Sequence, residues 1–254
     1  RAMDKDILKR LYVFNTAYKD EEGPISRKCK AEEVRVWGGT SLRIMFQLIY
    51  ILAFLCLLRF DEVLNIQWSW ITTDTHNGRY HIKLALPYRK THQYGDISPF
   101  FLYKNTTCPW LCPVKAFAQW IQLHERNNSS MNGYVFRCKV NLKYHSDGCY
   151  GMSADSFMEC FRNNLLDIGI DPHPYGTHSF RRGGCQYLIM ILRWPIMEVC
   201  SWAGWSDNFN SPGTIFKYLL SWVDEPSLEW NDYFNPDRCP GEPCSYCRQS
   251  CRCA

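Results

Sequence analysis

The stretch Thr177–Tyr218, THSFRRGGCQYLIMILRWPIMEVCSWAGWSDNFNSPGTIFKY, decides how this chain is interpreted. It places His178 and Arg181 three residues apart, so on a helix both side chains lie on one face. Thr177 directly before them is a suitable N-cap residue. The first turn of a helix has unpaired N–H groups and a partial positive charge. A histidine and an arginine there predict an anion site, with a phosphate group as the natural ligand.

A tyrosine follows this anion site in a second apparently helical segment, IFKYLLSW (residues 215–222). A phenol near a phosphate site indicates a nucleophile that attacks phosphorus. The chain has 15 tyrosines, so Tyr218 is weak evidence by itself. Tyr187, in the helix predicted to carry Arg181, and Tyr233, in a proline-containing tail, are the alternatives.

Four segments resemble, in the right order, the motif boxes of the tyrosine recombinases, the phage-integrase family. LLRFDEVLNIQW (57–68) is similar to the first-arginine box, and HSFRRGG (178–184) to the H-x-x-R box. AGWS (203–206) is similar to the Gly-His or Gly-Trp box, and IFKYL (215–219) to the segment of the nucleophilic tyrosine. Four boxes in order are far more specific than any one of them, and their order favours Tyr218 over its alternatives.

The resemblance spans roughly Gly39 to Trp222. Within the family, the chain is most similar to the recombinases of Crypton-type eukaryotic transposons. An Arg-Lys-Thr-x-Gln run, a Cys-Pro-Val before a helix and the ending TIFKYL carry this narrower similarity.

The resemblance implies an α+β fold, a mostly helical catalytic domain with a small antiparallel three-stranded sheet. We expect a catalytic domain at 39–225 and an irregular cysteine-rich tail at 226–254. Residues 1–38 are expected to form an N-terminal helix and linker, as a remnant of a DNA-clamping domain or its connection. Relatives carry such a clamping domain of about a hundred residues, a typical domain size.

Apolar spacing, capping residues and turn signals predict the individual elements. Three strands are expected between Trp68 and Tyr103, with a tight turn at Asn77-Gly78. The predicted helices are 4–19, Thr40 or Ser41 to Leu58, Val114–His124 with Pro113 in its first turn, one capped by Ser153 that runs to Ile168, one starting at Thr177, a short one that starts at Pro195 and ends before Gly204, and 214–222.

The resemblance assigns most of the chemistry to five residues. Arg59 and Arg181 would clamp the phosphate, each through paired hydrogen bonds. His178 would be a general acid/base and phosphate donor, and Tyr218 the nucleophile. Trp205 stands where many relatives have histidine; its indole N–H donates a hydrogen bond but does not shuttle a proton.

The acid that protonates the leaving group is a lysine at the turn between the second and third strands in the family. Lys90 fits this place best, and Lys83 in mid-strand is the competitor. Glu62 would orient Arg59 or His178, the alternative being an ordinary i,i+3 salt bridge.

Three further basic residues are predicted to contact DNA. These are Arg89 beside the turn, Arg182 and Lys217. For Arg182, a structural contact is the alternative.

Composition is compatible with these assignments. Net charge is +4, which permits nucleic-acid binding without arguing for it. The 14 cysteines show no tight framework before residue 230, and no secretory signal is visible, so a reducing compartment, the nucleus, is expected. The apolar run Ile44–Leu58 is short for a membrane span and is interpreted as a core helix, so we expect no membrane association.

No cofactor is expected, because a covalent enzyme–DNA intermediate stores the bond energy without metal. The tail contains Cys239, Cys244, Cys247 and Cys251, of which Cys244-x-x-Cys247 has the spacing of half a zinc site. No second such pair accompanies it, so a zinc site is the minor interpretation beside free cysteines.

The sequence thus predicts a site-specific DNA recombinase or integrase of a mobile element, which cleaves and rejoins double-stranded DNA through a 3′-phosphotyrosine. Self-association into dimers or tetramers on DNA is expected by resemblance. The alternatives are a domesticated, catalytically inactive DNA-binding descendant, a type IB topoisomerase, and an interaction module built on the cysteine tail.

Overall fold

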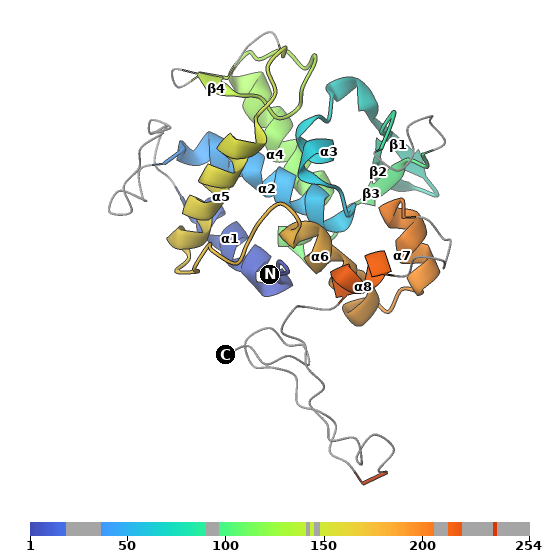
Figure 1. Ribbon diagram of the computed structural model, residues 1–254. Helices are drawn as coiled ribbons and strands as arrows, with labels where there is room; N and C mark the ends of the chain where they lie inside the picture. The colour runs from blue at the N-terminus through green and yellow to red at the C-terminus, as the bar shows by residue number, and fades with distance from the viewer. Residues whose placement is uncertain are drawn as a thin grey trace. The chain divides into compact units, whose positions relative to one another are not determined.

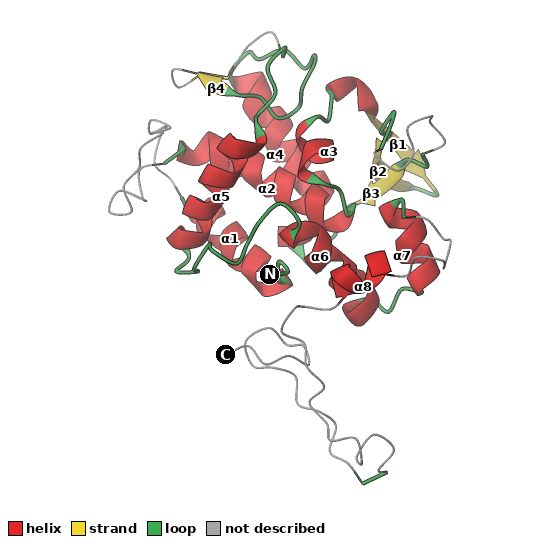
Figure 2. Ribbon diagram, in the orientation of Figure 1, coloured by secondary structure: helices red, strands yellow, loops and turns green. Residues whose placement is uncertain are grey.

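A computed structural model describes residues 1–18, 37–89, 97–140, 143–144, 148–205, 213–219 and 236–237. The chain divides into two units, residues 1–207 and 208–254. The first is mostly helical with one small three-stranded sheet (Figures 1 and 2), as predicted. Of the second, the structure describes helix α8 (Gly213–Leu219) and residues 236–237.

Helix α2 (Gly39–Leu55) forms the centre of the first unit. Its side chains from Met45 to Phe54 are all buried, so it needs neighbours on every side. Helices α1 (Lys5–Ala17), α4 (Pro113–Arg126) and α6 (Ser179–Gln186) supply them. The prediction that α2 reaches Leu58 is wrong, because Leu57 adopts a left-handed backbone, φ 49°, that ends the helix. Among the described residues, no helix has both the length and the apolarity to cross a membrane.

A buried ion pair ties α1 and α2 to α5 (Ala154–Asp167). Arg43 donates to the Asp167 carboxylate at 2.6 Å and to Asn15 of α1 at 3.2 Å. The same carboxylate accepts from the Trp37 indole at 3.0 Å. Helix α1 therefore packs within the first unit, and its origin as part of a clamping domain stays a prediction. Ser153 caps α5 by accepting from the Ser156 amide, as the sequence predicts.

The sheet has the strand order β1 (Ile71–His76), β2 (Arg79–Leu84) and β3 (Phe100–Tyr103), all antiparallel. Asn77 and Gly78 both have positive φ, which is the geometry of a two-residue hairpin turn. Two further strands of two residues, β4 (Lys139–Val140) and β5 (Lys143–Tyr144), were not predicted. The short helices α3 (Phe60–Leu64), η2 (Trp68–Trp70) and η3 (Pro109–Leu111) link these elements.

The backbone of helix α6 lies so close to its neighbours at two positions that only glycine fits there. A Cβ at Gly183 would collide with the Met3 carbonyl, and one at Gly184 with the Phe54 carbonyl of α2. The two glycines of HSFRRGG therefore let the α6 backbone lie directly on its neighbours. A π-helical turn, η4 (Tyr187–Ile191), follows, and then α7 (Ile196–Ala203), which ends before Gly204 as predicted.

His124 makes stability pH-dependent. Burial in α4 against Trp68 and Trp120 lowers its pKa from 6.5 to about 4. As the pH falls, His124 of the unfolded chain is therefore protonated before His124 of the folded protein. We expect the free energy of unfolding to fall by roughly 3 kcal/mol between pH 6.5 and pH 4. Urea unfolding across this range measures the loss. His124→Phe should flatten the profile, whereas His76→Gln, at an exposed strand position, should not; equal slopes in all three proteins would contradict the assignment.

Candidate functional site

Two neighbouring aromatic residues bring the predicted arginine boxes together. Phe60 and Phe180, each adjacent in sequence to one predicted clamp arginine, pack edge to face with ring centroids 5.5 Å apart. Phe60 also packs on Phe157 of α5, and Phe180 stacks on Tyr50 of α2. The hydrophobic core therefore fixes the position of Arg59 relative to Arg181.

The Glu62 carboxylate lies at the centre of three arginines. It lies 3.5 Å from Nη1 of Arg59, 3.3 Å from Nε of Arg89 and 3.8 Å from Nη1 of Arg181. It also accepts the backbone N–H of Arg59 at 2.8 Å. Three guanidinium charges and one carboxylate leave a surplus of two positive charges (+3 − 1), which favours an anion at this place.

Arg181 has the most constrained position of the three. It is 1% exposed, and its Nη2 donates to the Ala203 carbonyl at 3.0 Å. Its guanidinium carbon lies 5.2 Å from the Trp205 ring centroid, a cation–π contact. Arg181 of the H-x-x-R box and Trp205 of the Gly-Trp box are thus in contact, although 24 residues separate them in the sequence.

Arg59 is the more accessible of the two predicted clamp residues, with its side chain 23% exposed. It occupies the N-cap position of α3, where the backbone is extended. The sequence predicted Arg59 at the end of a long helix. Instead, the chain leaves α2, turns at Leu57 and starts α3, and this break directs Arg59 to the same cluster as Arg181.

Arg89, predicted as a DNA contact, lies buried beside Glu62. Arg89 is 3% exposed, and besides Glu62 it contacts the Trp202 carbonyl, to which Nη1 donates at 3.3 Å. A Cβ at Gly204 would lie 2.7 Å from this nitrogen. Pro87 interrupts the strand alternation, so Tyr88 is exposed and Arg89 points inward. Arg89 therefore helps to hold Glu62, a role that the sequence analysis missed.

His178 lies at the entrance of the cluster. The prediction that Thr177 caps this helix is wrong by one residue, because His178 itself is the N-cap and α6 begins at Ser179. His178 is exposed at the surface, yet partial burial and then Arg181, Arg59 and Arg182 lower its pKa, while Asp61 raises it. The lowered pKa favours the neutral imidazole, whose ring nitrogen is able to accept a proton.

Several predicted site residues lie in other elements or outside the described residues. Lys90 and the tail cysteines Cys239, Cys244, Cys247 and Cys251 lie outside the described residues, as does Tyr233. Lys83 is half-buried in β2. Tyr218 and Lys217 lie in α8 of the second unit, where Lys217 is exposed and Tyr218 half-buried. Within the described part of the chain, no group of three His, Cys, Asp or Glu is arranged to hold a metal ion.

Arg182 and Tyr187 both make contacts within the fold. Arg182 is half-buried, and its backbone N–H donates to the His178 carbonyl at 2.9 Å. Tyr187, the alternative nucleophile, packs on Phe54, and burial raises the pKa of its phenol. A raised pKa keeps the phenol protonated and makes Tyr187 a poor nucleophile.

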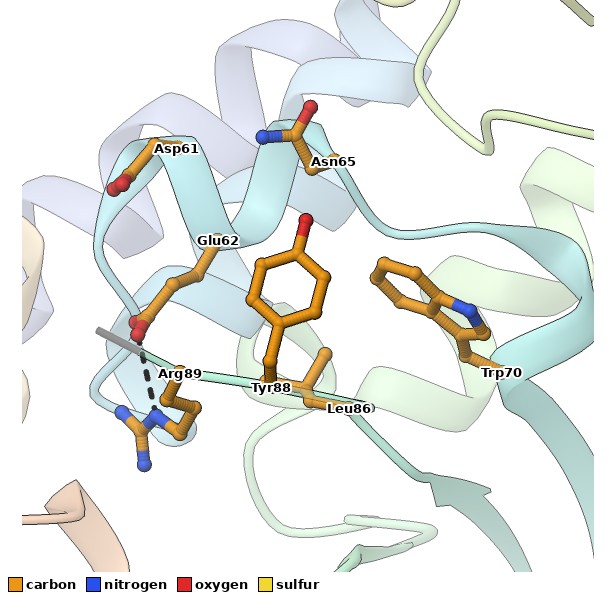
Figure 3. Close-up of a pocket in the computed structure, with 7 residues that line it drawn as sticks. All are labelled: Asp61, Glu62, Asn65, Trp70, Leu86, Tyr88 and Arg89. Atoms are coloured by element: carbon orange, nitrogen blue, oxygen red, sulfur yellow. Dashed lines mark hydrogen bonds and ion pairs between the residues drawn. The ribbon is translucent and has the colours of Figure 1, made fainter. Parts of the chain in front are cut away.

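A cavity of about 300 Å³ opens beside Glu62 (Figure 3). Helix α3 and its C-cap contribute Glu62 and two polar neighbours, and the chain after β2 contributes an apolar floor. The aromatic wall comes from Tyr88 after β2 and from Trp70 of η2. The lining residues are Asp61, Glu62, Asn65, Trp70, Leu86, Tyr88 and Arg89. The cavity was not predicted, because its two walls are distant in the sequence.

The described elements have the fold of a tyrosine-recombinase catalytic domain. XerH site-specific recombinase bound to palindromic difH substrate, in a post-cleavage complex, matches with a TM-score of 0.55 at 12% identity, over 87% of this chain and 49% of that one. The pre-cleavage complex of XerH with difH gives 0.53 at 13% identity, over 87% and 50%. At this identity the likeness concerns the fold alone.

Other comparisons add little. The Tn1549 transposon integrase with circular intermediate DNA reaches a TM-score of only 0.43 at 13% identity, over 81% of this chain and 64% of that one. The chain spans about half the length of the XerH chains that it matches. No protein-family model matches the sequence, and no curated protein does either.

The electrostatics of His178 can be tested directly. We expect its pKa in the folded protein to lie below 6.5, measured by NMR titration of the imidazole C–H signals, with His178→Gln for assignment. Arg182→Gln removes a repulsive charge and should raise this pKa, whereas Asp61→Asn removes an attractive one and should lower it. Shifts of the opposite sign would show that Arg182 and Asp61 do not act on the pKa of His178 through their charges.

Proposed function

We propose that this chain is the catalytic domain of a site-specific tyrosine recombinase, which cleaves and rejoins double-stranded DNA through a covalent 3′-phosphotyrosine. One observation carries the proposal: Arg59 and Arg181 share the Glu62 carboxylate, with His178 and Trp205 beside them, on a tyrosine-recombinase fold. XerH, which has this fold, was solved bound to its DNA substrate.

The charge of the cluster suits phosphoryl transfer. A phosphodiester carries one negative charge, and its non-bridging oxygens gain further negative charge in the five-coordinate transition state. The surplus of two positive charges around Glu62 matches the transition state better than the ground state. Donors fixed in advance at the place where charge develops are the main source of rate acceleration in such sites.

The proposed reaction balances without an external energy source. The Tyr218 phenol oxygen forms a bond to phosphorus, and the bond from phosphorus to the 5′-oxygen breaks. The neutral His178 imidazole accepts the phenol proton, and Lys90 gives a proton to the departing 5′-oxygen. The reverse attack, by a 5′-hydroxyl on the phosphotyrosine, rejoins the strand and restores the phenol.

The wider setting of this activity follows from the sequence resemblance. We place the protein in the nucleus, acting for a Crypton-type mobile element in integration or excision. Dimers or tetramers assemble on DNA, so that four protomers hold two duplexes. Arg182 and Lys217, which is exposed on α8, would contact the DNA backbone.

Covalent trapping tests the nucleophile. We expect the protein, incubated without metal on nicked fragments from the ends of its element, to form a denaturant-resistant protein–DNA band. Tyr218→Phe should abolish this band while DNA binding is retained, because only the attacking oxygen is lost. The matched controls are Tyr187→Phe and Tyr233→Phe, which should both trap DNA. A band that persists in Tyr218→Phe but disappears in a control would move the nucleophile to that residue.

No band in the wild-type protein, together with measurable DNA binding, would favour the alternative of a domesticated DNA-binding protein without catalysis. Relaxation of a single supercoiled circle without strand exchange between duplexes would favour a type IB topoisomerase.

The clamp is tested at Arg181. Arg181→Ala should slow cleavage by at least about 100-fold, because it removes one transition-state donor. Arg181→Lys keeps a charge but loses the paired donors, so it should restore only part of the rate. Single-turnover cleavage measures both, with Arg126→Ala, at an exposed position of α4, as the charge-matched control. Wild-type rates in Arg181→Ala, with its fold verified by circular dichroism, would remove Arg181 from the site.

A further inference from the structure

We propose that the cavity beside Glu62 binds an unpaired nucleobase of the DNA next to the cleaved phosphate. This inference rests on the proposed function, since it assumes that the arginine cluster holds a DNA phosphate. It adds a second subsite, for a base lifted out of the double helix.

The volume and walls of the cavity suit a small flat ligand. At about 300 Å³ it lies at the lower end of small-molecule sites. Leu86 is buried in its floor, and the rings of Trp70 and Tyr88 form one wall, with centroids 6.4 Å apart and planes at 76°. Figure 3 shows the Tyr88 ring between Glu62 and Trp70. Tyr88 is 58% exposed, so its ring is accessible for stacking.

The charges of the lining favour a neutral ligand in the cavity itself. Glu62 and Arg89 pair with each other, so among the described lining residues Asp61 is the charge that remains to face a ligand. Arg89 is already engaged by Glu62 at 3.3 Å. A neutral ligand with N–H donors therefore fits better than an anion, and nucleobases are neutral and carry such donors.

Two polar groups at the rim suit the edge of a base. Asp61 and Asn65 are exposed, lie four residues apart along the α3 segment and line the cavity. Neither side chain makes a hydrogen bond or ion pair with another described residue. A carboxylate accepts from exocyclic amino groups, and an amide both donates and accepts, so together they match the hydrogen-bonding edge of a base.

The cavity and the arginine cluster share a wall. Glu62 lines the cavity and also contacts Arg59 and Arg181, and Arg89 belongs to both sites. A ligand that spans them has a phosphate at one end and an aromatic ring at the other, which is the shape of a nucleotide. Stacking on an aromatic side chain contributes about 1–3 kcal/mol per base, enough to offset much of the cost of unstacking it.

The experiment compares short duplexes that differ at one central position. One carries a single unpaired adenine, and the other carries an abasic unit in its place. We expect the wild-type protein to bind the adenine bulge about 5-fold to 100-fold more tightly than the abasic duplex. This range is obtained from the stacking energy of one base, at about 1.4 kcal/mol per factor of ten in the dissociation constant. Contacts to the DNA backbone contribute equally to both dissociation constants, so their contribution cancels in the ratio.

Three variants locate this preference. Tyr88→Leu should reduce the ratio toward one, whereas Tyr88→Phe should keep it, because the ring is retained. The matched control is Tyr80→Leu, an exposed tyrosine of β2 outside the cavity, which should keep the ratio. Trp70→Leu provides a second test of the same wall. A wild-type ratio near one, or an unchanged ratio in Tyr88→Leu and Trp70→Leu, would overturn the inference.

The outcomes separate this inference from the proposed function. Covalent trapping by Tyr218 without a bulge preference would overturn the base site and leave the recombinase. A preference that depends on Tyr88 without trapping would support the base site and overturn the catalytic function. No binding to any DNA would overturn both.

Discussion

The site depends on one carboxylate that three arginines share. Guanidinium groups this close repel one another, and burying any of them is unfavourable unless it is paired. Glu62 resolves the conflict by contacting all three and by accepting the Arg59 backbone N–H. A second carboxylate in contact would halve the surplus positive charge, and without any carboxylate the three arginines would repel one another. Glu62 therefore sets both the geometry of the arginine cluster and its net charge, which a simple i,i+3 salt bridge with Arg59 would not do.

The scaffold places these groups through contacts that carry no charge. Phe60 and Phe180 sit in one aromatic cluster with Tyr50 and Phe157, so each clamp arginine follows or precedes a buried anchor. Gly183 and Gly184 let α6 lie directly on α2 and the N-terminal segment. Because protein interiors are densely packed, a small shift in any of these layers would move Arg181 relative to Arg59.

Much of this could be predicted from the sequence, and the failures have physical causes. Local signals were sufficient for α5 with its Ser153 cap, for α4 with Pro113 in its first turn, and for the Asn77-Gly78 hairpin. The end of α2 was missed because Leu57 adopts a left-handed backbone that no local signal announces. Arg89 was assigned to DNA because it lies beside Lys90 at the turn. Pro87 shifts the register there, and Glu62, 27 residues earlier, draws Arg89 inward. The cavity depends on the same register shift, since it is what exposes Tyr88.

The register shift at Pro87 therefore has two consequences at once. Continued alternation would direct Arg89 to solvent and bury Tyr88, so that Glu62 would contact only Arg59 and Arg181. Arg89 also contacts the Trp202 carbonyl at the end of α7, close to Ala203, whose carbonyl accepts from Arg181. One residue thus connects α3, the chain after β2 and the end of α7, which are the three segments around the clamp. Arg89 can in this way be as necessary to the site as Arg59 and Arg181, because it fixes the carboxylate that all three arginines contact.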